Sequence, residues 1–138
     1  MSDPTREAET SSVRTLMFLY GGAALLHFAH NGLYLREYPN LPAWLTSAGV
    51  YAAWCATTVI GVLGYWLYRR ISRRAGLVTI ALYAALGCAG LDHYAVAPIT
   101  AHSTTMNATI LLEVVCAMVL LGYVVRAWFL TSSATQAA

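Results

Sequence analysis

The chain has no lysine, which excludes any chemistry that needs a lysine Schiff base, such as that of retinal or pyridoxal phosphate proteins. It has no GxGxxG or GxxxxGKS/T pattern, so it lacks the glycine-rich loops that cradle phosphates. Charged residues make up only 10% of the 138 residues, and the net charge of +2 leaves no basic stripe for a nucleic acid. No CxxC pair occurs, and we expect Cys55, Cys88 and Cys116 to pack as small apolar side chains.

Apolar residues are abundant: they make up 59% of the chain and give a mean hydropathy of +0.59. A typical soluble chain is only about 45–50% apolar. The apolar residues fall into runs that each reach the roughly 20 residues a transmembrane helix needs. These runs are Thr15–Tyr34, Ala43–Tyr68, Gly76–Ala97 and Thr104–Leu130. We therefore expect an all-α integral membrane protein, with a four-helix antiparallel transmembrane bundle over residues 15–130, a polar tail over 1–14 and a C-terminal tail over 131–138.

Residues that oppose helix or membrane insertion separate the runs. The prolines of segment 38–42 disfavour helix between the first two runs, and Pro98 does so between the last two. An arginine cluster at residues 69–74 separates the second run from the third. Ser103 or Thr104 is available to cap the last helix.

The arginines indicate how the bundle is oriented. Only Arg36 of the 8 arginines lies on one side of the predicted bundle, and all the others lie on the opposite side. The positive-inside rule then places both termini and loop 69–74 in the cytoplasm, and segments 34–42 and 98–103 outside. Tyr38 falls near a run end, where interfacial aromatic residues are common. We expect a multi-pass protein of the cell inner (plasma) membrane whose first run is an uncleaved anchor.

Polar residues gather in the outer half of the predicted bilayer, although the orientation rests on arginine alone. This layer contains His27, His30, Asn31, Glu37, Asp92, His93, His102, Asn107 and Glu113. An ionisable side chain inside a membrane is costly, so such residues are functional candidates.

Helical spacing places several of these residues on shared faces. His27 and His30 lie three residues apart, and Tyr34 continues their face. If the last helix extends back to His102, spacings of three and four residues place His102, Met106, Thr109, Glu113 and Cys116 on one face. Because exposure of Glu113 to lipid is unfavourable, we expect this face to point into the bundle. The pattern predicts that histidines from different runs converge with Glu113 in a shared interior.

Imidazole and carboxylate groups on facing helices are ligands from which bundle cores build transition-metal sites. The leading hypothesis is therefore a copper, iron or zinc site near the outer face of a membrane oxidoreductase of redox or hydroxylase type. The expected ligands are His27, His30, His93, His102 and Glu113. Asp92 is expected to orient His93, with Asn31 as a further supporting residue. Met106 would be a soft ligand favouring copper.

Three alternatives remain open. The first is a metal-free, isomerase- or cyclase-like enzyme on a lipid-soluble small molecule, with His27 and Glu113 as acid and base. The second is a b-type haem held by one histidine from the first run and one from the third, with flat apolar room beside Gly87 and Gly90. The third is a non-catalytic subunit of a larger membrane complex or oligomer, in which the histidines only join helices. No motif identifies a family.

Overall fold

The computed structural model describes residues 4–136, and every regular element in that range is a helix. In chain order the elements are α1 (Pro4–Leu33), η1 (Leu35–Glu37), α2 (Ser47–Arg70), α3 (Arg73–Gly87), η2 (Cys88–Leu91), α4 (Asp92–Val96), η3 (Ile99–Ala101) and α5 (Thr104–Gln136). The predicted all-α class is therefore confirmed for the described residues.

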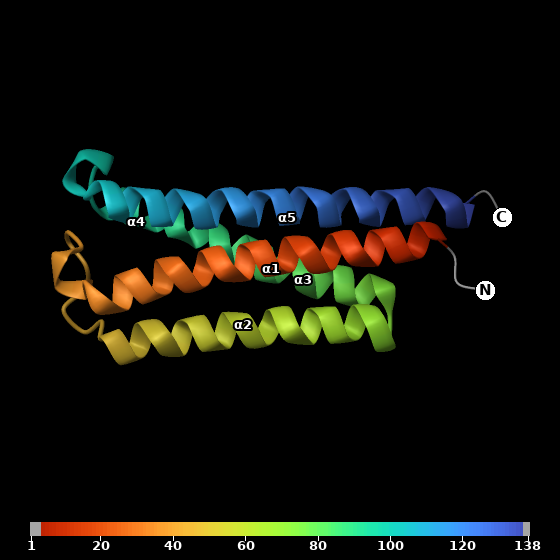
Figure 1. The fold of residues 1–138 in the computed structure, drawn as a ribbon, viewed down its shortest axis with the longest axis horizontal. Coiled ribbons are helices and arrows are strands. Elements are labelled where there is room, and N and C mark those ends of the chain that lie inside the picture. Colours follow the sequence, from red (N-terminus) through yellow and green to blue (C-terminus); the bar gives the residue numbers. More distant parts are fainter. Residues whose placement is uncertain (1–3, 137–138) are drawn as a thin grey trace.

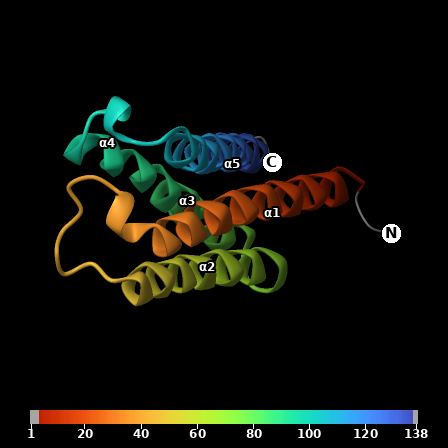
Figure 2. The same cartoon turned by 60° about the vertical axis from the view of Figure 1, so that its left-hand side comes forward.

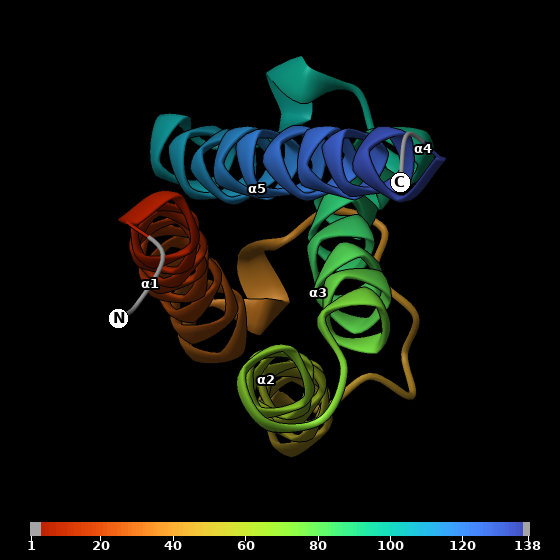
Figure 3. The same cartoon turned by 90° about the vertical axis from the view of Figure 1, so that its right-hand side faces the viewer.

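The long helices lie side by side (Figure 1). The described ends of the chain and the α2–α3 turn lie at one end, which we call the termini end. Residues 34–46 and 97–103 lie at the opposite end, the loop end, which Figure 2 brings forward. Seen along α1 and α2 in Figure 3, α1 and α3 lie between α2 and α5. Accordingly, α1 and α3 each pack against both α2 and α5.

Three helices are long and apolar enough to cross a membrane: Ser47–Arg70, Arg73–Val96 and Thr104–Phe129. The second of these combines α3, η2 and α4 into one helical segment. Much of the apolar surface faces outward, with Phe18 76% and Phe129 64% exposed. Such exposure suits a lipid environment and supports a membrane protein. The first predicted span, in α1, is not among these three helices, because polar side chains interrupt its apolar run. Membrane crossing by α1 therefore stays a prediction.

Side-chain caps fix several helix boundaries. The Ser103 hydroxyl accepts a hydrogen bond from Met106 N at 3.3 Å, as the predicted cap of α5 requires. The Thr46 hydroxyl accepts one from Gly49 N at 3.1 Å, so α2 begins at Ser47 and not at Ala43 as predicted.

Helix also extends into both predicted tails. α1 begins at Pro4, inside the segment 1–14 predicted as a polar tail, and α5 reaches Gln136, inside the tail predicted over 131–138. Residues 1–3 and 137–138 lie outside the described residues.

Glu9 explains why α1 extends into the predicted tail. Its carboxylate accepts hydrogen bonds from the Tyr68 hydroxyl at 2.8 Å and from Arg73 Nε at 3.0 Å. The Arg73 guanidinium also donates to Ala127 O at 3.1 Å. These contacts join α1, α2, α3 and α5 at the termini end.

Small residues allow close helix packing in the same half of the molecule. A Cβ added to Gly64 would lie 3.0 Å from the backbone nitrogen of Ile80, so α2 approaches the α3 backbone directly. A Cβ on Gly76 would meet the backbone of Tyr68 at the α2–α3 turn. Close packing of this kind is typical of membrane helices.

Candidate functional site

A change of helix type near the end of α3 shapes the site. The chain passes into η2, a tighter turn over Cys88–Leu91, before α4 begins. Gly90 in this turn lies against α5, where an added Cβ would be 3.3 Å from Val114 Cγ2 and 3.7 Å from Glu113 Oε2. A side chain at Gly90 would therefore crowd Val114, while its Cβ would be at ordinary contact distance from the Glu113 carboxylate.

His27 of α1 and Glu113 of α5 face each other in the interior. His27 Nε2 lies 3.8 Å from Glu113 Oε2, and the two residues are only 3% and 2% exposed. The other ring nitrogen, His27 Nδ1, is buried and has no hydrogen-bond partner among the described residues. The structure thus brings together two site residues that lie far apart in the sequence, on adjacent helices.

His93 of α4 lies beside this pair. Its ring centroid is 5.3 Å from that of His27, and the two rings are steeply inclined at 73°. His93 Nε2 is 3.5 Å from Asn31 Nδ2, whereas Asp92 is exposed. Asn31 is therefore within hydrogen-bond distance of His93, whereas Asp92, the residue expected to orient it, interacts with His93 through its charge.

Tyr38, which sequence reasoning assigned to the membrane interface, lies among the histidines. It is 4% exposed, and its hydroxyl is 2.9 Å from His30 Nδ1. Its ring centroid lies 5.1 Å from that of His93 and 6.4 Å from that of His102. Burial raises the pKa of Tyr38 to about 12, so its hydroxyl holds its proton more tightly than an exposed tyrosine does. In the sequence, Tyr38 is marked only by its position directly before Pro39. An interfacial tyrosine can occupy the same position, so this signal does not identify a site residue.

The helix α5 begins at Thr104 and does not extend back to His102, which lies in the connection before it. The chain leaves η3 in extended conformation at His102, and its Nδ1 lies 3.1 Å from Pro98 O. Its Nε2 is buried without a partner in the described part of the chain. The Met106 sulfur accepts a hydrogen bond from Ser103 N at 3.4 Å, so this sulfur contributes to the start of α5.

Two further polar residues of the predicted layer lie near the surface. Asn107 accepts a hydrogen bond from the Tyr94 hydroxyl at 2.9 Å and donates one to Ile99 O at 3.1 Å. It therefore holds α4 and η3 against α5. Glu37 is exposed in η1, and the structure does not bring it into the buried site.

A cavity of about 230 Å³ opens beside the buried pair. Its polar wall consists of His27, Asn31, His93 and Glu113. Its other walls are mainly apolar and include Leu41, Leu45, Val50, Ala53, Leu86 and Ala89. The cavity thus offers an apolar ligand direct contact with an imidazole and a carboxyl group.

The geometry gives less support to a metal or haem. Between residues 4 and 136, no group of three or more His, Cys, Asp or Glu side chains is arranged to hold a metal ion. The expected room beside Gly87 is filled, because a Cβ there would come within 2.5 Å of the Tyr20 hydroxyl oxygen. Gly90 faces Val114 and Glu113. The expected room is therefore absent beside Gly87, whereas Gly90 lines the cavity of about 230 Å³. The haem and the metal site both stay predictions.

Comparison with protein-family models, curated proteins and solved structures gave no match for this chain. Function must therefore be argued from the site itself.

Proposed function

We propose that the protein crosses the inner (plasma) membrane four times, with both termini and the α2–α3 turn in the cytoplasm. The three apolar helices and the outward-facing apolar side chains of α1 support this topology. Arg69, Arg70 and Arg74 lie at the termini end, and Arg36 lies at the loop end. A cysteine in place of Glu37 should then react with an impermeant maleimide in intact cells, whereas one in place of Arg70 should react only after permeabilisation. The parent chain, which retains its native cysteines, measures the background.

We further propose that His27 and Glu113 are the acid–base pair of a metal-free enzyme acting on a small lipid-soluble molecule. The single observation that carries this proposal is the 3.8 Å approach of His27 Nε2 to Glu113 Oε2 at the wall of a mainly apolar cavity. Buried acid–base groups facing a ligand cavity are a typical arrangement for proton transfer to a bound substrate.

The chemistry requires one proton on the pair. The unprotonated member removes a proton from one atom of the substrate, and the protonated member returns a proton to another, so a double bond moves without any redox change. The rings of Phe28 and His93 both contact the His27 ring at steep angles and so help to fix its orientation. His27 and Glu113 are only 3% and 2% exposed, which limits the access of water to the reacting atoms.

Deuterium incorporation tests this function whatever the identity of the substrate. Membranes containing the protein are incubated in D₂O with a lipid extract, and the lipids are analysed by mass spectrometry. We expect a lipid species that gains deuterium with the wild type and with Glu37→Gln, a matched variant of an exposed carboxylate at the same end. Glu113→Gln and His27→Gln should abolish the gain. Equal incorporation with wild type and Glu113→Gln would overturn the proposal.

A further inference from the structure

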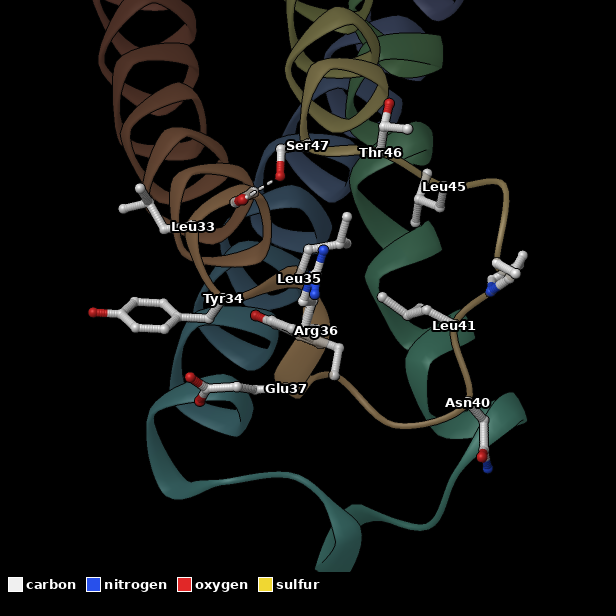
Figure 4. A pocket seen from close by; sticks show the side chains of 14 residues that line it. Leu33, Tyr34, Leu35, Arg36, Glu37, Asn40, Leu41, Leu45, Thr46 and Ser47 are labelled. Atoms are coloured by element: carbon white, nitrogen blue, oxygen red, sulfur yellow. Dashed lines mark hydrogen bonds between the residues drawn. The ribbon is translucent and has the colours of Figure 1, made fainter.

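A second cavity, of about 810 Å³, lies at the loop end and is formed by residues 32–47 (Figure 4). We call it the loop pocket. The Ser47 hydroxyl donates to Gly32 O at 2.7 Å and holds the start of α2 against the end of α1. Asn40 Nδ2 donates to Val96 O at 2.9 Å and holds the middle of the loop against the end of α4. The loop pocket is therefore fixed at both places.

The loop pocket and the site cavity have two wall residues in common, Leu41 and Leu45. Both are half-buried, and Leu41 packs against the core cluster that contains Tyr38 and Met106. The side chains of Leu41 and Leu45 therefore lie between the loop pocket and the cavity that contains the His27–Glu113 pair.

Arg36 and Glu37 give the loop pocket one positive and one negative side chain. Arg36 lines the pocket, and the other seven arginines lie on the opposite side of the predicted bundle. Within the described range, no hydrogen bond or ion pair engages its guanidinium. Figure 4 shows the Glu37 carboxylate on the side of the pocket away from Leu41 and Leu45. An unpaired guanidinium near two leucines that separate the loop pocket from the site cavity suits a ligand with an anionic group and an apolar body.

We propose that the ligand is a single-chain amphiphile with an anionic head group, a carboxylate or a phosphate. Its head binds Arg36 in the loop pocket, and its apolar chain passes Leu41 and Leu45 into the site cavity. The assignment of this amphiphile as a substrate rests on the proposed acid–base function, whereas its binding does not. The polar entrance at a membrane surface and the apolar interior match the two parts of such a molecule.

Quenching of tryptophan fluorescence by a spin-labelled fatty acid tests the binding. Trp44 lies in the loop and Trp54 lies one residue after Ala53 of the site cavity, so both are suited to report a bound label. The full chain in neutral nanodiscs is titrated with the labelled fatty acid, its methyl ester and the corresponding phosphate. We expect the two anions to bind about 10-fold more tightly than the ester, as charge-assisted hydrogen bonds permit.

The preference for an anion should disappear in Arg36→Gln, persist in part in Arg36→Lys, and remain intact in Arg69→Gln, an arginine of the opposite end. Leu45→Trp should weaken binding of the long chain while hexanoate still competes for the loop pocket. Equal affinity for acid and ester in the wild type, or an unchanged preference in Arg36→Gln, would overturn the inference.

The two proposals fail in different ways. Glu113→Gln should retain the anion preference, because it leaves Arg36 in place. Loss of deuterium incorporation in Glu113→Gln, together with an unchanged preference in Arg36→Gln, rejects only the amphiphile. An Arg36-dependent preference with deuterium incorporation that does not depend on Glu113 rejects only the acid–base function.

Discussion

The hydroxyl of Tyr38 lies 2.9 Å from Nδ1 of His30, which joins the loop after η1 to the last turn of α1. Tyr38 also contacts the rings of His93 and His102. One buried tyrosine thus connects three histidines of the loop end, and its removal should affect the packing of this whole end.

Tyr38→Phe should lower the free energy of unfolding by about 1 kcal/mol, because His30 loses a buried hydrogen-bond partner. Thermal unfolding in detergent measures the loss. Tyr34→Phe is the matched control, because Tyr34 is 46% exposed. Equal effects of the two substitutions would contradict the importance of the Tyr38 contact.

Tyr38 should also make stability depend on pH in the alkaline range. Burial raises its pKa from 10.0 to about 12, so the folded state holds the hydroxyl proton more tightly than the unfolded state does. This contribution is present below pH 10 and is lost as the pH rises towards 12. We expect the wild type to lose more stability over this interval than Tyr38→Phe, measured by thermal unfolding at each pH. Parallel curves would argue against a buried Tyr38 hydroxyl.

Asn40 should be important for the position of the loop. It has a positive φ of 56°, and its side chain donates to Val96 O at 2.9 Å. Asn40→Gly loses the hydrogen bond but accepts the backbone angle, whereas Asn40→Ala also introduces backbone strain of about 1 kcal/mol. Asn40→Ala should therefore be the less stable variant in thermal unfolding. The reverse order would contradict the described conformation of the loop.

Glu9 should contribute to the packing of the termini end. Glu9→Gln weakens the contacts with Tyr68 and Arg73, and we expect a loss of about 1–2 kcal/mol, since both charged side chains are largely buried. Glu7→Gln, an exposed neighbour on the same helix, provides the control in denaturant unfolding. A loss of equal size in both variants would mean that the ion pair adds no specific stability.

Hydropathy and capping rules captured much of the fold. The lengths of the second, third and fourth apolar runs and the Ser103 cap followed from local sequence, because membrane length and backbone hydrogen bonding constrain them directly. The extension of α1 through Glu9 did not follow, because its partners Tyr68 and Arg73 are distant in the sequence.

The candidate site was predictable only in part. Helical spacing and the cost of a charge in lipid selected His27 and Glu113, which the structure places together. Spacing could not identify Tyr38 or the role of Asn40, because both depend on the path of an irregular loop. Spacing also could not decide whether the last helix extends back to His102, since a period shared with Met106 does not reveal where the helix begins.

Elemental analysis separates the acid–base function from the predicted metal site. The wild type, His27→Ala and His93→Ala are each purified in detergent. We expect no stoichiometric copper, iron or zinc in any of them, because a coordinating group of three side chains is lacking over residues 4–136. About one metal ion per wild-type chain, lost in both variants, would favour the metal site instead.

Infrared titration of Glu113 tests most directly whether His27 and Glu113 act as an acid–base pair that carries one proton. In the purified wild type, we expect a carbonyl band of a protonated buried carboxyl group that is absent from Glu113→Gln. Its titration should move to a different pH in His27→Gln, because the ring whose Nε2 lies 3.8 Å from the carboxylate is then lost. A Glu113 band that titrates identically with and without His27, or the absence of any such band, would contradict the proposed acid–base pair.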